Sequence, residues 1–313
     1  MVRSRYTGPQ RKPRMTQATS RSRHWLIDFL TLSAIWGSSF MFTQIGALDL
    51  GVVPTTFARV GIASLFLLPL LLIKGQGAAL LRVWRPGMVL ALFTSALPFL
   101  AYAVALQHIS TSTAAIVNAT TPLFGATIAW LWLHEQLNTT RVLGLALGFI
   151  GVCALVISKS LGTDHWASDL GGTLVCLLAP LCYGIAASFS RRHMPQVTPL
   201  VTASASQVGS TLWLLLPALW TWPMHAVAWS TWAAMGALGI VCSGVAYILF
   251  FRIISIAGAA KALTVTFAVP VFALLYGVSL LGENISGAAL ASASIIIAGI
   301  VLATGLWTPK ARA

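Results

Sequence analysis

The chain has 313 residues, of which 58% are hydrophobic and only 8% are charged. A soluble domain carries about 25% charged residues, so this composition excludes an ordinary soluble fold and places most of the chain in lipid. The formal net charge of +13 does not indicate nucleic-acid binding, because the basic residues lie between long apolar runs. The four cysteines lie inside apolar runs without metal-ligand spacing, and we expect neither a metal nor a cofactor.

Residues 1–24 are polar and basic, and we expect them to form a disordered cytoplasmic tail. The apolar run that follows is too long for a secretory signal, so it is predicted to be an uncleaved first membrane helix. Ten segments of roughly the ~20 residues needed to cross a bilayer follow one another along the chain. They lie at about 25–45, 53–73, 87–106, 111–133, 139–158, 170–190, 198–219, 230–250, 258–281 and 285–307.

The basic residues are distributed unevenly between the two sides of these ten predicted helices. With the N-terminus inside, seventeen of the nineteen Lys and Arg residues lie in cytoplasmic segments. Lys159 lies in an outer loop, and Arg59 lies within a helix. The positive-inside rule therefore predicts that both termini are cytoplasmic.

Two stretches of the chain, 110–135 and 258–283, repeat one pattern. In each, a proline precedes a glutamate by thirteen positions, and an offset of about 148 residues relates Pro122 to Pro270 and Glu135 to Glu283. Each half then contains five predicted helices, an odd number, so the second copy must enter the membrane inverted. Inverted repeats place a substrate site near the midplane, between the halves.

Several short motifs carry a resemblance to a known family. The string Trp-Gly-Ser-Ser-Phe at 36–40, Pro54 followed by 57–59, and the two proline–glutamate pairs resemble the EamA repeats of the drug/metabolite transporter superfamily. In the second copy Tyr183 replaces the tryptophan and Gln207 replaces the arginine, so any site is asymmetric.

The resemblance implies two five-helix EamA repeats at 25–158 and 170–307, an outer linker at 159–169 and a short cytoplasmic tail at 308–313. It implies a basket-like cavity lined by spans one to four and six to nine, with spans five and ten outside. It also implies a secondary transporter, not an enzyme, that moves a small metabolite such as an amino acid across a bacterial inner membrane by alternating access.

The candidate substrate-binding residues are polar or aromatic side chains within the predicted spans. They are Trp36, Ser39, Gln44, Tyr102, Asn118, Thr121, Tyr183, Gln207, Tyr247 and Thr266. Polar faces of membrane helices point at protein or water, so these residues can line a cavity. The same residues can serve helix packing, in which small side chains permit close approach and hydroxyls bond across helices.

Arg59 is the most informative single residue. A charge within a span costs at least ~2.5–3.5 kcal/mol, so it should face a cavity or a partner. It can hold a substrate carboxylate through a two-pronged hydrogen bond. It can also pair with Glu283 or Asp49 as a structural lock or outer gate, which we favour from sequence.

Pro122 and Pro270 each free a backbone carbonyl one turn earlier, which a ligand, a water or a neighbouring hydroxyl must satisfy. Glu135 and Glu283 end their helices at the membrane surface, where pairing with nearby bases or helix ends is the expected role.

Two other classes of function were weighed. A membrane-embedded lipid-modifying enzyme needs clustered acids, a histidine pair or a nucleophile with a base, and the predicted spans offer none. A non-transporting scaffold would rely on the basic tail, because the loops are short. The expected partners are a small-molecule substrate and the lipid bilayer, without nucleic acid, and a homodimer is left open.

Overall fold

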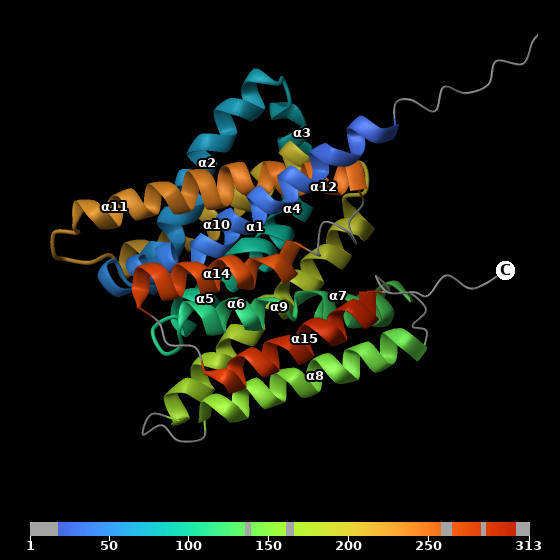
Figure 1. Cartoon of the computed structure of the whole chain (residues 1–313). Helices are drawn as coiled ribbons and strands as arrows, with labels where there is room; N and C mark the ends of the chain where they lie inside the picture. The colour runs from blue at the N-terminus through green and yellow to red at the C-terminus, as the bar shows by residue number, and fades with distance from the viewer. Residues whose placement is uncertain (1–17, 135–138, 161–165, 258–264, 283–285, 305–313) are drawn as a thin grey trace, which may run out of the picture.

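The computed structural model describes residues 18–134, 139–160, 166–257, 265–282 and 286–304, and every regular element in these ranges is a helix (Figure 1). Each of the ten predicted segments contains a described helix, which confirms the all-α fold. The unbroken helices are α1 (Ala18–Asp49), α2 (Val52–Ile73), α8 (Thr139–Ser160), α9 (Trp166–His193), α10 (Pro199–Trp220), α14 (Val265–Leu281) and α15 (Gly287–Thr304). The short helix α3 (Gly77–Arg82) follows α2.

Three predicted spans are composite. The third consists of α4 (Trp84–Ala91), the π-helical segment η1 (Leu92–Ala96) and α5 (Leu97–Ala105). The fourth consists of α6 (Thr111–Asn118) and α7 (Thr121–Leu133), and the eighth of α11 (Trp229–Gly236), the π-helical segment η2 (Ala237–Val245) and α12 (Ala246–Ala257). Among the described residues, five helical segments are long and apolar enough to cross a membrane: Val52–Ile73, Trp84–Ala105, Thr111–Leu133, Leu170–His193 and Trp229–Phe250.

Helices α8 and α15, the fifth and tenth spans, pack against each other along one side of the molecule (Figure 1). They contact the rest of the protein through α7 and α9. Glycines make this close pairing possible, because a side chain at Gly299 would collide with the backbone of Gly148. Small residues of this kind let membrane helices approach closely. The pair therefore lies outside the other helices, as the family resemblance implies.

Many of the buried side chains are small or polar, whereas many of the exposed side chains are large and apolar. Serines and threonines such as Ser33, Ser95 and Ser204 are fully buried. Leu65, in contrast, has 74% of its surface exposed, and Trp220 has 91%. This distribution suits lipid as the solvent, because lipid favours exposed apolar side chains and leaves helix packing to small residues and hydroxyls.

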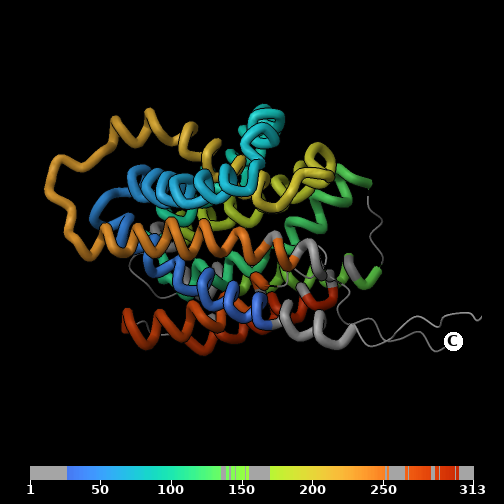
Figure 2. The backbone as a smooth tube through the Cα atoms, turned by 90° about the horizontal axis from the view of Figure 1, so that it is seen from above, coloured from blue at the N-terminus to red at the C-terminus, as the bar shows by residue number. Residues whose placement is uncertain are grey.

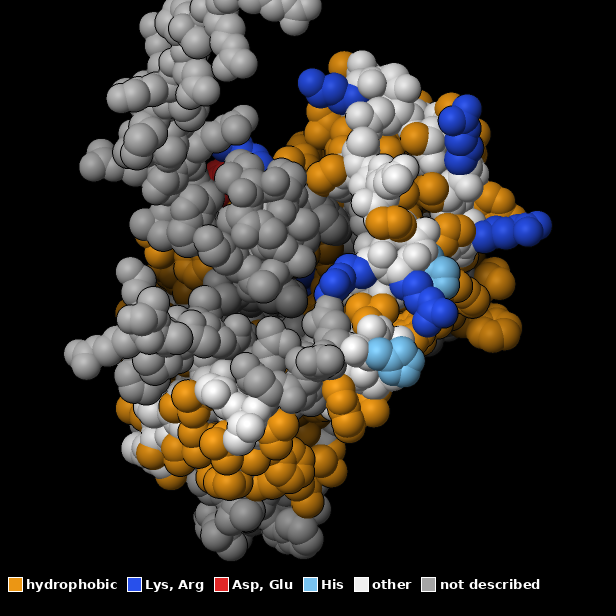
Figure 3. All heavy atoms as spheres, turned by 90° about the vertical axis from the view of Figure 1, so that its right-hand side faces the viewer, with side chains coloured by type: hydrophobic (Ala, Val, Ile, Leu, Met, Phe, Trp, Pro, Cys, Tyr) orange, Lys and Arg blue, Asp and Glu red, His pale blue; other side chains and the backbone are white. Residues whose placement is uncertain are grey.

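The described ends of the chain lie at the same end of the helix bundle. Most helices run along one common direction, and the start of α1 and the end of α15 are at the right of Figure 1 (Figures 1 and 2). Figure 3, which views that end, shows Lys, Arg and His side chains on its surface, and Lys74, Arg191, Arg192, His134 and His193 are among the exposed residues of the chain. An open hollow of about 440 Å³ lies among Trp132–His134 and the two arginines.

Candidate substrate site

A buried cluster of aromatic rings joins the two halves of the chain. The ring of Tyr102 in α5 lies 5.2 Å from Phe40 in α1 and 6.4 Å from Tyr183 in α9. The indole of Trp36 lies 6.3 Å from Tyr247 and 5.2 Å from another α12 ring, that of Phe250. Trp36 and Tyr183 both pack against the core residues around Tyr102, and Tyr183 also packs against those around Tyr247. These four predicted site residues therefore form one group, which we call the aromatic cluster.

The fourth span is interrupted beside the aromatic cluster, and the interruption follows from its proline. Helix α6 is capped by Ser110, whose hydroxyl accepts a hydrogen bond from the backbone N–H of Thr113, and it ends at Asn118. Because Pro122 has no N–H, the carbonyl of Asn118 loses its helical donor. The hydroxyl of Thr121 donates to that carbonyl at 2.6 Å, so a neighbouring hydroxyl satisfies it, as one of the alternatives predicted.

The interruption leaves the side chain of Asn118 available to the aromatic cluster. The hydroxyl of Tyr102 donates to the Asn118 Oδ1 at 2.7 Å, and both residues are buried. The second half differs, because Pro270 lies inside the continuous helix α14. Within the described residues, only the first copy is therefore interrupted beside its proline.

Sequence reasoning missed that the third and eighth spans each contain a π-helical segment, at positions about 148 residues apart. In η2, the hydroxyl of Ser243 donates to the carbonyl five residues earlier, that of Leu238, at 3.0 Å. Just after η1, Pro98 cannot donate to the carbonyl of Thr94. The hydroxyl of Tyr247 from the other half donates to it at 3.3 Å.

These π-helical segments hold the partners of Arg59 and Gln207. The Nε of Arg59 donates to the Ser243 Oγ at 2.9 Å, and the Nε2 of Gln207 donates to the Ser95 Oγ at 2.9 Å. The offset of about 148 residues that relates Arg59 to Gln207 also relates Ser95 to Ser243. The two hydrogen bonds are thus equivalent contacts, each made between the two halves. Ser95 and Ser243 are themselves separated by this offset, so the sequence alone could have identified them as a matched pair.

Arg59 does not pair with Asp49, which corrects one of the two partners considered from sequence. The guanidinium Cζ lies 3.6 Å from the centre of the Phe99 ring, and Arg59 is 5% exposed. Tyr102, Tyr183 and Tyr247 lie within electrostatic range of it. The other proposed partner, Glu283, lies outside the described residues, as does Glu135.

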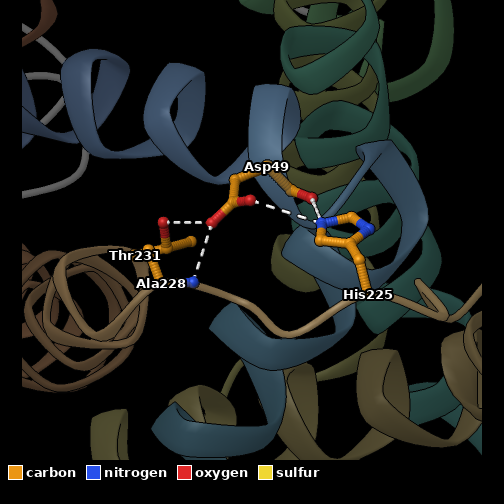
Figure 4. A network of polar contacts seen from close by, with 4 residues as sticks. All are labelled: Asp49, His225, Ala228 and Thr231. Atoms are coloured by element: carbon orange, nitrogen blue, oxygen red, sulfur yellow. Dashed lines mark hydrogen bonds and ion pairs between the residues drawn. The ribbon is translucent and has the colours of Figure 1, made fainter.

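Asp49, at the end of α1, instead holds the segment that precedes α11 (Figure 4). Its Oδ2 accepts the hydroxyl of Thr231 at 2.5 Å and the backbone N–H of Ala228 at 3.3 Å. His225 Nε2 lies 3.4 Å from its Oδ1. The hydrogen bond from Thr231, aided by Ala228 and His225, lowers the pKa of the Asp49 carboxyl below its usual value.

The other predicted residues lie around the aromatic cluster or apart from it. The hydroxyl of Ser39 donates to the carbonyl of Trp36 within α1, at 2.8 Å. The Nε2 of Gln44 donates to the Leu106 carbonyl at 3.3 Å and so ties α1 to the end of α5. Thr266 is buried in α14. Within the described ranges, no three His, Cys, Asp or Glu side chains come together as metal ligands.

The sequence matches the model of the EamA-like transporter family twice, over residues 24–157 and 170–305. The chain therefore belongs to the EamA-like transporter family, within the drug/metabolite transporter superfamily, and is a multi-pass membrane protein. The family consists of transporters and not of enzymes.

Curated relatives cover most of the chain. A "S-adenosylmethionine/S-adenosylhomocysteine transporter" of Chlamydia trachomatis is 24% identical, with 85% of this chain and 84% of the relative covered. A "Probable terminal-alkyne amino-acid exporter" of Streptantibioticus cattleyicolor is 25% identical (85% and 89% covered). The "Uncharacterized inner membrane transporter YedA" of Escherichia coli K12 is 24% identical (87% and 88% covered).

A solved crystal structure shares the fold. It has a TM-score of 0.64 and 22% sequence identity, and the match covers 90% of this chain and 98% of the other.

Proposed function

We propose that this protein is a secondary transporter that moves a small metabolite with an amino-acid group across a bacterial inner membrane by alternating access. The observation that carries the proposal is the buried aromatic cluster, which both halves of a transporter-family chain build together. Trp36, Tyr102 and Tyr183 offer stacking surfaces, while Asn118 and Gln207 offer hydrogen-bonding groups. Few but well-placed polar groups in an apolar surrounding are typical of small-molecule sites.

The chemistry of the relatives supports the same substrate class. Amino acids, S-adenosylmethionine and S-adenosylhomocysteine all carry an amino group and a carboxylate on one carbon. The names of two relatives mention these compounds. The inner-membrane location is proposed from the bacterial relatives, one of which is named an inner membrane transporter.

The proposed orientation places the basic end of the bundle in the cytoplasm. The described ends of α1 and α15 lie at that end (Figure 1), whose surface carries Lys and Arg side chains (Figure 3). A cytoplasmic excess of Lys and Arg is what the positive-inside rule requires. We propose with it two inverted five-helix repeats, 25–158 and 170–307, joined by an outer linker at 159–169 and flanked by cytoplasmic tails.

The remaining predicted residues keep supporting roles in the proposal. Thr121 and Pro122 shape the interrupted fourth span, Pro270 and Thr266 shape the ninth, and Ser39, Gln44, Tyr247, Glu135 and Glu283 complete the predicted set. A homodimer is compatible with this arrangement but is not needed for it.

Metabolite profiling tests the proposed function. Cells with and without the protein are compared for amino acids and their derivatives, inside the cells and in the medium. We expect at least one such compound to shift between the two pools in a protein-dependent way, which also gives the direction of transport. A profile without any protein-dependent shift, together with silent Trp36→Ala and Tyr102→Ala variants, would overturn the proposal.

A further inference from the structure

Arg59 places a positive charge among aromatic rings that bring no negative charge. Its guanidinium lies against Phe99 at 3.6 Å, and its Nε bonds to the neutral hydroxyl of Ser243. Stacking on an aromatic face attracts a cation, but it supplies no neutralising charge. Among the described residues, the guanidinium of Arg59 therefore contacts only an aromatic ring and one neutral hydroxyl.

The acids whose side chains the structure describes are engaged elsewhere. Asp28 forms an ion pair with Arg252, at 3.1 Å between Oδ2 and Nε. Asp49 is held by Thr231, Ala228 and His225. Within the described part of the chain, Arg59 therefore has no carboxylate partner.

The equivalent contact in the other half shows that the fold does not need this charge. Gln207 makes the same kind of hydrogen bond to Ser95, also at 2.9 Å, with a neutral amide. Both contacts join the two halves across the same pair of π-helical segments. Because an amide suffices to hold one of the two contacts, the positive charge of Arg59 is surplus to helix packing.

The geometry leaves the two amino groups of the guanidinium free to bind an anion. Nε is used by Ser243 and one face is covered by Phe99. Neither Nη atom has a hydrogen-bond acceptor among the described residues, and 5% of the surface of Arg59 stays accessible. Two parallel N–H donors match the two oxygens of a carboxylate, and burial strengthens such a pair.

We propose that Arg59 binds the carboxylate of the transported metabolite and so selects solutes that carry one. This inference rests on the proposed function and replaces the structural lock that sequence alone favoured. The solute places its carboxylate on the Nη groups and its remaining part among the rings of Tyr102, Tyr183 and Tyr247. Binding neutralises the buried charge, so a solute that lacks a carboxylate leaves the arginine without compensation.

Full-length protein in liposomes provides the test. The liposomes are loaded with a mixture of the proteinogenic amino acids and S-adenosylhomocysteine, and release is followed by mass spectrometry. Each released acid is then compared with its carboxamide, which has nearly the same shape but lacks the negative charge of the carboxylate. We expect wild-type protein to release the carboxamide at least tenfold more slowly than the acid.

Four variants separate binding from folding. Arg59→Gln keeps a donor for Ser243 and makes the first half resemble the second, and we expect its release of the acid to fall at least tenfold. Arg59→Lys keeps the charge and should retain more activity than Arg59→Gln. Ser243→Ala removes the acceptor of Nε and the donor to the Leu238 carbonyl, so release of the acid should fall, but less than in Arg59→Gln. Lys74→Gln removes an exposed charge outside the aromatic cluster and should stay within about threefold of wild type.

The outcomes distinguish this inference from the proposed function. If wild-type protein releases acid and carboxamide equally, or if Arg59→Gln transports the acid like wild type, transport stands and the assignment to Arg59 is overturned. If Arg59→Gln loses activity together with a clearly lower melting temperature, Arg59 is a structural lock and the assignment is again overturned. If wild-type protein releases no compound of the mixture, both proposals fail.

Discussion

The two halves of this protein build the same contact with different chemistry. In the first half Arg59 reaches across to Ser243, and in the second half Gln207 reaches across to Ser95, with the same distance of 2.9 Å. The scaffold around them is repeated down to the π-helical segments that carry the serines. The two halves therefore share the hydrogen bond to a serine in a π-helical segment. They differ in one residue, Arg59 against Gln207, and this difference introduces the positive charge.

The two halves also differ in the helices that contain the matched prolines, Pro122 and Pro270. The fourth span stops at Asn118 and restarts at Thr121, whereas α14 continues through Pro270. The offset also pairs Tyr102 with Phe250 and Asn118 with Thr266, so the hydrogen bond from Tyr102 to Asn118 has no equivalent in the second half. This one polar contact is therefore made in the first copy and not at the matched positions of the second.

The largest effect is expected at Gly299, where the two halves meet through α8 and α15. A side chain at Gly299 meets the backbone of Gly144 and Gly148, which cannot move aside. Gly299→Leu should therefore destabilise by at least the upper part of the about 1–3 kcal/mol range for overpacking. Thermal unfolding in detergent, followed by size-exclusion chromatography, measures the change.

The matched position in the first half sharpens this prediction. A Cβ at Gly151 meets Ile296, with the nearest side-chain atom at 2.8 Å, so Gly151→Ala should also destabilise, but less than Gly299→Ala. A Cβ at Gly236 meets nothing within 4 Å, so Gly236→Ala serves as the control. Equal melting temperatures for all three alanine variants would contradict the helix pairing described here.

The second prediction concerns the uncompensated charge. Arg59→Met replaces the guanidinium by an apolar chain of similar length, which removes a charge that costs at least ~2.5–3.5 kcal/mol within a span. We expect the melting temperature to stay level or rise while transport of the acid is lost. Gln207→Met, which removes a neutral group, should change the melting temperature less.

Thermal unfolding and liposome release, measured on the same preparations, check the Arg59→Met prediction. A fall in the melting temperature of Arg59→Met well below that of Gln207→Met would mean that the charge stabilises the fold, and the asymmetry between the halves would then be structural.

A smaller effect is expected at the hydrogen bond present in one half only. Tyr102→Phe makes this position resemble Phe250 and removes the donor to the Asn118 Oδ1. The loss should cost about 1 kcal/mol of stability and weaken transport, because Oδ1 is then left with Thr121 alone, at 3.4 Å. Phe250→Tyr is the reverse variant, and a larger loss in Phe250→Tyr than in Tyr102→Phe would contradict this account.

The smallest effect concerns the contact at the C-terminal end of α1. Because the pKa of Asp49 is lowered in the folded protein, its contribution is fully present above the usual carboxyl value of about 3.9 and is lost as the pH falls through the lower folded value. Fluorescence of Trp229 and Trp232, which flank Thr231, should therefore change in acid. Asp49→Asn should show the changed signal already at neutral pH, and an identical titration in both proteins would rule out this role for Asp49.

The helices and the duplication could be predicted from the apolar runs and from the offset of about 148 residues between the halves, because both signals extend over long segments. The ten apolar runs predicted helices correctly, and the matched prolines predicted the duplication that the family model also finds. The aromatic cluster was predicted in part, since polar and aromatic residues in apolar runs are conspicuous. That these residues bind substrate remains a prediction.

Three features could not be predicted, because they depend on contacts between distant segments. Nothing in the sequence near Asp49 indicates that Thr231 and His225 hold it in place of Arg59. Nothing near Pro270 indicates that α14 continues through it while the equivalent proline follows a break. The π-helical segments arise where a helix adapts its hydrogen bonds to its neighbours, which no local pattern records.

The π-helical segments have a mechanical consequence. A π turn holds one residue more than an α turn, so converting η2 to α-helix would rotate everything beyond it by about 100° around the helix axis. Tyr247 would then swing away from the Thr94 carbonyl while Trp229–Gly236 stayed in place. A change of one residue in such a turn is therefore enough to rotate the side chains of α12 around the helix axis without breaking the eighth span.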